Sequence, residues 1–101
     1  MKEVNVIALD KINEIALEGE IDASLADAFF AEVIECYQKN PAPIFFDCTK
    51  LDFIDSTTLG TFVKILKRVK MDGNTITLQN LQPKIKKLFL ICSLDSIMEI
   101  K

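Results

Sequence analysis

The chain has 101 residues, of which 50% are hydrophobic, with 12 Lys and Arg against 15 Asp and Glu and a formal net charge of −3. This length and composition predict one globular domain over residues 1–101 with a sizeable core, and they exclude disordered or low-complexity architecture. The sequence contains no histidine, which excludes Ser-His-Asp and Cys-His catalytic sites, His-ligated zinc and histidine phosphorelay.

Three cysteines, Cys36, Cys48 and Cys92, lie singly in apolar surroundings and lack the C-x-x-C spacing. This pattern predicts reduced, buried thiols in a cytoplasmic protein, with no disulfide framework and no metal site. The first ten residues have no small-residue cleavage site, and no uncharged run approaches the ~20 apolar residues that span a bilayer. We therefore expect a cytoplasmic protein without a targeting peptide or a membrane-inserted segment.

The charges are distributed unevenly along the chain. Residues 1–63 hold four bases and twelve acids, whereas residues 64–101 hold eight bases and three acids. This split is consistent with charge-steered contact with a partner, and also with solvated helix faces that differ in sign. The basic cluster of Lys84, Lys86 and Lys87 has no interleaved aromatic residues, so we expect no nucleic-acid binding.

Two strands and a helix open the predicted fold. Residues 4–9 and 12–18 have strand patterns, and Asp10-Lys11 between them predicts the turn of an antiparallel hairpin. The helix is predicted to begin with Ser24 as its N-cap, with Asp27 completing a shortened capping box. Its predicted apolar stripe consists of Leu25, Ala26, Phe29, Phe30, Val33, Cys36 and Tyr37. Residues 40–43, which include two prolines, end the helix.

The second half alternates strands and helices. Residues 44–48 form a nearly continuous apolar run, which predicts a strand buried on both faces at the centre of the sheet. A loop over residues 51–54, a helix from about residue 55 to the turn at 72–74, a strand over 75–79 and a helix near Pro83 follow. Residues 96–100 are apolar but of undetermined type. The order β-β-α-β-α-β-α predicts an α/β fold, with about four strands in a mixed, mostly parallel sheet and helices packed on it.

Three consecutive hydroxyl residues, Ser56, Thr57 and Thr58, lie at the predicted start of the second long helix. In α/β sheets, functional sites commonly lie outside the carboxyl end of a strand, next to a helix N-terminus. One hydroxyl is enough to cap the helix, which is one interpretation of the group. The other is a phosphorylation site, because the positive end of the helix dipole tolerates a phosphate there.

The segment Phe46 to Gly60 resembles the signature of the STAS domain family, in particular the bacterial anti-sigma factor antagonists. Residues 55–60, Asp-Ser-Thr-Thr-Leu-Gly, resemble the family's Asp-Ser-(Ser/Thr)-Gly-Leu-Gly. Residues 19–22, Gly-Glu-Ile-Asp, resemble its Gly-x-(Leu/Ile)-Asp, and the turn at 72–74 and the apolar residues of the last helix fit its closing pattern. The resemblance extends over nearly the whole chain and implies a small STAS-like α/β sandwich.

The resemblance also implies a partner-switching function. The expected partners are an anti-sigma factor that is also a Ser/Thr kinase and a phosphatase; no cofactor, metal or enzymatic activity is expected. Thr57 matches the family's phosphorylated residue, and Ser56 is the second choice. The implied partner-binding residues are Asp22, Ser24, Asp55, Ser56, Thr57, Thr58, Leu59 and Gly60. Thr58 departs from the family, which usually has Gly at that position, beside the expected acceptor.

Two other functions remain open on the sequence. The first is a STAS scaffold that is not phosphorylated, or an accessory subunit in a stress-sensing assembly or a lipid-transport ATPase; Thr58 in place of Gly favours it slightly. The second is an enzyme that uses Asp52 and Asp55 as paired carboxylates. It is the weaker of the two, because a general acid-base pair needs a substrate pocket and a carboxyl with a perturbed pKa, neither of which the sequence shows. The sequence also has no phosphate-binding Gly-x-x-x-x-Gly-Lys-Ser/Thr loop.

Overall fold

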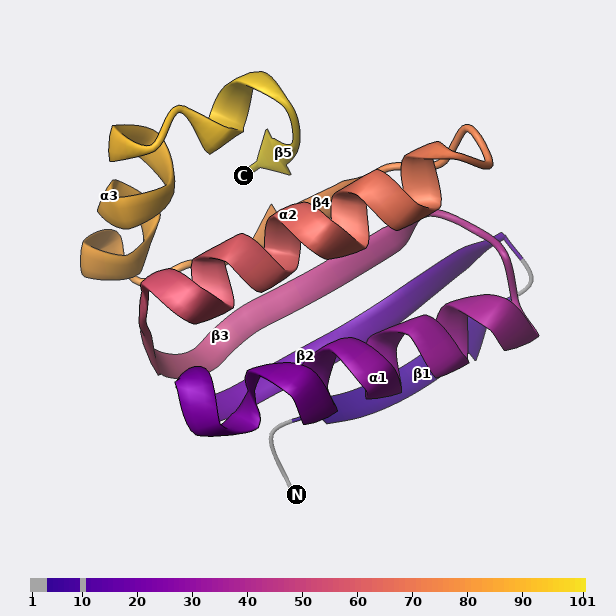
Figure 1. Cartoon of the computed structure of the whole chain (residues 1–101), viewed down its shortest axis with the longest axis horizontal. Coiled ribbons are helices and arrows are strands. Elements are labelled where there is room, and N and C mark those ends of the chain that lie inside the picture. The colour runs from indigo at the N-terminus through magenta and orange to yellow at the C-terminus, as the bar shows by residue number, and fades with distance from the viewer. Residues whose placement is uncertain (1–3, 10) are drawn as a thin grey trace.

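The computed structural model describes residues 4–9 and 11–101, with side chains from Lys11 onward (Figure 1). Two long helices lie side by side on one face of a five-stranded sheet. In chain order the elements are β1 (Val4–Leu9), β2 (Ile12–Ile21), α1 (Ala23–Lys39), β3 (Ile44–Ile54), α2 (Ser56–Lys70), β4 (Ile76–Gln79), α3 (Pro83–Ile91), the 3-10 helix η1 (Leu94–Ser96) and β5 (Glu99–Ile100).

The sheet has the order β1-β2-β3-β4-β5. Strands β1 and β2 are antiparallel, and the remaining neighbours are parallel. The predicted α/β fold with a mixed, mostly parallel sheet is confirmed, and β3 is its central strand. The segment of undetermined type supplies a short fifth strand, anchored where the Lys101 N–H donates to the Leu78 carbonyl at 2.8 Å. The predicted turn residue Asp10 lies outside the described residues.

Strand β3 continues to Ile54, so the prediction of a loop over residues 51–54 is wrong. The extended chain keeps pairing with β2 through two register irregularities, which bring Ile21 opposite Ile54. Along this stretch Leu51 and Ile54 are buried, whereas Asp52 and Phe53 are exposed. These exposed residues hide the strand in the sequence, because a strand with one solvated face and bulges lacks a continuous apolar run.

The prediction that Ser24 caps α1 is also wrong, because Asp22 is the N-cap. The Asp22 carboxylate accepts a hydrogen bond from the Ser24 N–H at 2.9 Å. Asp and Ser are about equally good N-caps, so local sequence does not choose between them. The end of β2 at Ile21 makes the choice, because the helix begins as soon as strand pairing stops.

Four phenylalanines form the centre of the core. The Phe62 ring, from α2, lies 5.3 Å from the Phe29 ring of α1, 5.3 Å from the Phe46 ring of β3 and 5.5 Å from the Phe89 ring of α3. All four side chains have 0% exposure. Tilted and edge-on ring pairs at such distances are favourable beyond the area they bury. Phe62 therefore joins both long helices, the central strand and α3.

The cysteines are all free, but only one is fully buried. Cys48 has 0% exposure, whereas Cys36 is partly buried and Cys92 is exposed, so the prediction of three buried thiols is wrong. Helix α3 ends at Ile91 and buries only Ile85 and Phe89, which leaves Cys92 outside the core. Within the part of the chain that the structure describes, no helix has the length and apolar character needed to cross a membrane.

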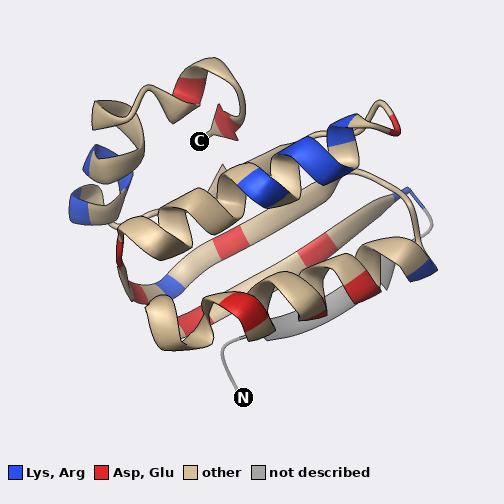
Figure 2. Cartoon of the chain, in the orientation of Figure 1, with Lys and Arg blue, Asp and Glu red and all other residues tan. Residues whose placement is uncertain are grey.

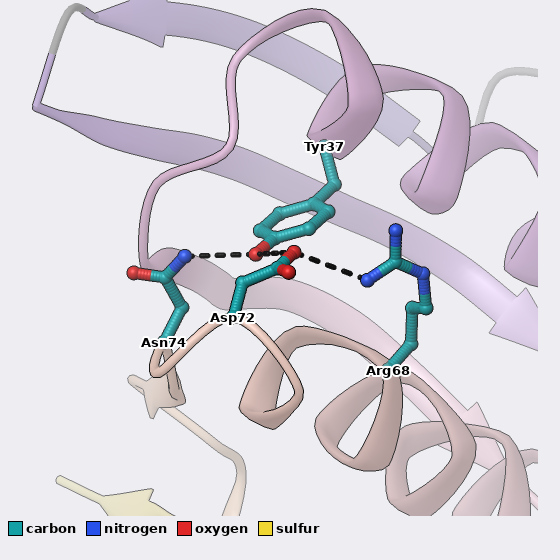
Figure 3. A network of polar contacts seen from close by, with 4 residues as sticks. All are labelled: Tyr37, Arg68, Asp72 and Asn74. Carbon is teal, nitrogen blue, oxygen red and sulfur yellow. Dashed lines mark hydrogen bonds and ion pairs between the residues drawn. The ribbon is translucent and has the colours of Figure 1, made fainter.

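A polar network joins the C-terminal ends of α1 and α2 (Figure 3). Tyr37 is 1% exposed; its hydroxyl donates to Asp72 Oδ2 at 2.9 Å and accepts from Asn74 Nδ2 at 2.8 Å. Arg68 donates to the same carboxylate oxygen at 3.1 Å and lies over the Tyr37 ring. The hydrogen bond from Tyr37, and then the one from Arg68, hold the pKa of Asp72 below its ordinary value.

Candidate functional site: two helix starts at one edge of the sheet

The site lies where two neighbouring parallel strands end. Because Ile21 of β2 pairs with Ile54 of β3, the residues that follow, Asp22 and Asp55, leave the sheet at the same edge. Asp22 is the N-cap of α1 and Asp55 is the N-cap of α2. Both helix N-termini, with their free amides and positive dipole ends, therefore lie side by side (Figure 1).

Asp55 holds the two helix starts together. Its Oδ1 accepts the Thr58 N–H at 2.9 Å in its own helix, and its Oδ2 accepts the Ala23 N–H of α1 at 2.7 Å. The hydrogen bond from the Thr58 backbone is the main cause that lowers the pKa of Asp55 below its ordinary value, with a further contribution from the Ala23 amide. The carboxylate is therefore negatively charged near neutral pH and fixed in position.

The three consecutive hydroxyls have different environments. Ser56 and Thr57 are exposed, whereas Thr58 has 0% exposure. The Thr58 hydroxyl donates to the Ile21 carbonyl at 2.6 Å and lies 3.1 Å from Asp55 Oδ1. Asp55 provides the cap of α2, so none of the hydroxyls is needed as the N-cap. The first turn of α2 thus leaves two hydroxyls, those of Ser56 and Thr57, open to solvent.

The other predicted partner-binding residues divide into exposed and buried ones. Ser24 and Gly60 are exposed and Asp22 is partly exposed, all near the two helix starts. Leu59 is only 9% exposed and belongs to the core, so its side chain and that of Thr58 support the site from within. Asp52 and Asp55 have separate partners: Asp52 Oδ1 accepts from Gln82 Nε2 at 3.2 Å, whereas Asp55 accepts from the Thr58 and Ala23 amides.

An apolar groove lies next to the helix starts and was not predicted. It has a volume of about 280 Å³ and is lined by Asp52, Phe53, Ile54, Lys84, Ile85 and Leu88. Phe53 is 44% exposed and Leu88 is 40% exposed, large fractions for apolar side chains. The sign of this groove in the sequence was Phe53, an apolar residue beside Asp52. The predicted loop over residues 51–54 gave the Phe53 side chain no packing partner. Among the described residues, no three His, Cys, Asp or Glu side chains group as metal ligands.

A family model described as the STAS domain matches residues 3–101. The chain therefore belongs to the STAS domain family. An anti-sigma-B factor antagonist from Listeria monocytogenes is 36% identical over 89 residues, which cover 87% of this chain and 77% of the relative. The resemblance predicted from residues 46–60 is thus confirmed at the level of the family.

Solved structures show the same fold. A candidate anti-sigma factor antagonist from Thermotoga maritima superposes with a TM-score of 0.88 at 24% identity, covering 98% of this chain and 86% of that one. The antagonist SpoIIAA superposes in its unphosphorylated form with a TM-score of 0.76 at 17% identity, over 97% of this chain and 86% of its own. Its phosphorylated form, from Bacillus, gives 0.74 at 19% identity, over 97% and 90%.

Proposed function

We propose that this chain is an anti-sigma factor antagonist that binds an anti-sigma factor with Ser/Thr kinase activity and is released from it by phosphorylation of Thr57. The observation that carries the proposal is the first turn of α2, where Thr57 is exposed beside a fixed carboxylate while the neighbouring Thr58 hydroxyl is already engaged. The named function of the Listeria relative supports the choice of partner.

The chemistry of the switch follows from the position of Thr57. The kinase transfers the γ-phosphoryl group of ATP: the Thr57 Oγ1–P bond forms, the bond from phosphorus to the β,γ-bridging oxygen breaks, ADP leaves, and the hydroxyl proton passes to a base of the kinase. The product carries about −1.5 to −2 charges close to Asp55. The phosphate adds bulk and negative charge beside Asp55, and the site then no longer fits a partner surface that is complementary to the unmodified hydroxyl. A phosphatase reverses the step by hydrolysis of the phosphate ester.

The contact surface extends from the helix starts in two directions. The acidic residues of α1, Asp27, Glu32 and Glu35, favour a basic surface of the anti-sigma factor (Figure 2). The groove beside Phe53 and Leu88 is a site in which an apolar side chain of the same partner can be buried. Thr58 in place of Gly, the feature that favoured a scaffold without phosphorylation, leaves Thr57 accessible, because the Thr58 side chain is buried and its hydroxyl donates to the Ile21 carbonyl.

The test begins with purification of the anti-sigma factor that the chain retrieves from the cell that encodes it. This protein is incubated with ATP and the wild-type chain, and the phosphorylated residue is mapped by mass spectrometry. We expect phosphate on Thr57, none in Thr57→Ala, and undiminished incorporation in the control Ser56→Ala. Equal phosphorylation of Thr57→Ala, or retrieval of no anti-sigma factor, would contradict the proposal.

A further inference from the structure

Gly60 lies in the interior of α2, and nothing in the fold of this chain requires a glycine at that position. Its backbone has no positive φ, and a Cβ built on it meets nothing within 4 Å. Glycine in the interior of an exposed helix is less favourable than alanine, because it loses more backbone entropy on folding. The chain therefore keeps a residue that weakens α2 at a position where any small side chain would fit within this molecule.

Gly60 shares one exposed face of α2 with several other residues. At 100° per residue, an arc of about 80° includes Thr57, Gly60, Lys64, Lys67 and Met71, the residue that follows the helix. We call these five residues the α2 stripe. All are exposed, Met71 to 80%, whereas Leu59, Phe62, Ile65, Leu66 and Val69 face the core. The proposed phosphorylation site is at one end of the α2 stripe and the two lysines are in its second half.

The lysines of the α2 stripe have no acidic partner among the described residues. Arg68, one residue further round the helix, pairs with Asp72 at 3.1 Å, but neither Lys64 nor Lys67 makes an ion pair in that part of the chain. Helix α2 contains no Asp or Glu between Ser56 and Lys70. Figure 2 shows Lys and Arg positions in the second half of α2, and Asp and Glu positions along most of the neighbouring α1. The exposed lysines are thus free to pair with acidic groups of another molecule.

We propose that the α2 stripe is a docking surface on which an acidic segment of the anti-sigma factor lies closely against Gly60 and pairs with Lys64 and Lys67. The absent side chain lets the partner's backbone approach α2 one turn beyond Thr57, and the lysines fix its register along the helix. The inference rests on the proposed function and adds to it a second contact of opposite charge. The basic groups of the partner meet α1 and its acidic groups meet α2, so only one orientation satisfies both.

The test measures affinity and thermal stability together, with the purified anti-sigma factor as the probe. Gly60→Ala should raise the unfolding temperature of the free chain and still weaken binding; Gly60→Leu should weaken binding about tenfold or more. Lys64→Glu with Lys67→Glu should weaken binding about tenfold at low salt, with a smaller loss at high salt. The control, Lys86→Glu with Lys87→Glu on α3, changes the net charge equally and should bind as the wild type does.

The outcomes separate this inference from the function on which it rests. If the wild-type chain binds the anti-sigma factor and the Gly60 and Lys64/Lys67 variants bind equally well, the docking surface is wrong and the proposed function stands. If the α3 control loses affinity as much as the α2 variant, the effect is one of net charge and the docking surface is again wrong. If the wild-type chain does not bind the anti-sigma factor, the proposed function fails and the docking surface fails with it.

Discussion

At the scale of single residues, neighbouring hydroxyls of one type have opposite roles. The sequence presents Ser56, Thr57 and Thr58 as equivalent, and local chemistry supports a cap or an acceptor at each. The difference between them comes from β2, whose last carbonyl, that of Ile21, accepts from the Thr58 hydroxyl across 37 residues of sequence. The motif in the sequence located the site, but a contact of this sequence separation is not encoded in any local pattern.

Thr58→Val tests the buried hydroxyl. Valine keeps the shape of threonine and removes the donor to the Ile21 carbonyl, so we expect a loss of about 1–3 kcal/mol in the free energy of unfolding, measured by urea denaturation. Thr57→Val is the matched control, and its effect should stay within about 0.5 kcal/mol because Thr57 is exposed. Equal stability of the two variants would show that the hydrogen bond has no structural role.

Asp55 makes the stability of the chain dependent on pH. Hydrogen bonds, chiefly from the Thr58 amide, lower its pKa in the folded chain below the ordinary value of about 3.9. A lowered folded-state pKa contributes stability that is present above the ordinary value and is lost as the pH falls through the folded-state value. The pKa values of Asp47 and Asp72 are lowered as well and act in the same direction.

We therefore expect the free energy of unfolding to fall as the pH is lowered from about 5 towards 3, and to fall less in Asp55→Asn. Urea denaturation at several pH values measures both profiles. Asp27→Asn is the control, because the exposed Asp27 accepts no hydrogen bond from the described residues. An Asp55→Asn profile parallel to that of the wild type would contradict the assignment of Asp55.

At the scale of elements, α1 and α2 are joined at both ends and along the middle. Asp55 connects their starts, the Phe29–Phe62 pair connects their centres, and the Tyr37 network connects their ends. The helices themselves were predictable from 3.6-residue periodicity and the prolines after α1. The extension of β3 and the strand β5 were not, because both depend on pairing with distant strands that no local pattern specifies.

Tyr37→Phe tests the far connection between the helices. The variant loses the hydroxyl that donates to Asp72 and accepts from Asn74, and we expect the free energy of unfolding to decrease by about 1 kcal/mol. Affinity for the anti-sigma factor should not change, because the Tyr37 side chain is only 1% exposed and offers a partner no surface to contact. A loss of binding without a loss of stability would contradict a purely structural role for the Tyr37 hydroxyl.

The groove between the end of β3 and α3 gives a prediction about partner contact. Phe53→Ser should weaken binding of the anti-sigma factor by about tenfold, because an apolar side chain that the partner buries is replaced by a polar one. The control is Ile91→Ser, since Ile91 is 68% exposed on α3 but does not line the groove. Isothermal titration calorimetry compares the two; equal affinity of both variants and the wild type would exclude the groove from the interface.

At the scale of the whole molecule, we expect the proposed switch to add charge without rearranging the fold. The Thr57 side chain is exposed, and the Thr57 carbonyl accepts a hydrogen bond from the Thr61 hydroxyl at 3.0 Å. SpoIIAA superposes on this chain in both its unphosphorylated and its phosphorylated form. On its inner side, α2 is joined to α1 by the hydrogen bond from the Ala23 amide to Asp55 and by the Phe29–Phe62 pair. A phosphate on Thr57 meets solvent on one side and a fixed scaffold on the other.

Thr57→Glu separates a change of surface charge from a change of fold. A negative charge in the first turn of α2 interacts favourably with the helix dipole, by about 0.3–1 kcal/mol, and unfavourably with Asp55. These effects oppose each other, so the free energy of unfolding should stay within about 0.5 kcal/mol of the wild type. Binding of the anti-sigma factor should fall about tenfold or more, while Thr57→Gln, which is similar in size and uncharged, should lose less. If Thr57→Gln loses as much affinity as Thr57→Glu, bulk explains the effect; if Thr57→Glu unfolds the chain, the switch acts through the fold and not through the docking surface.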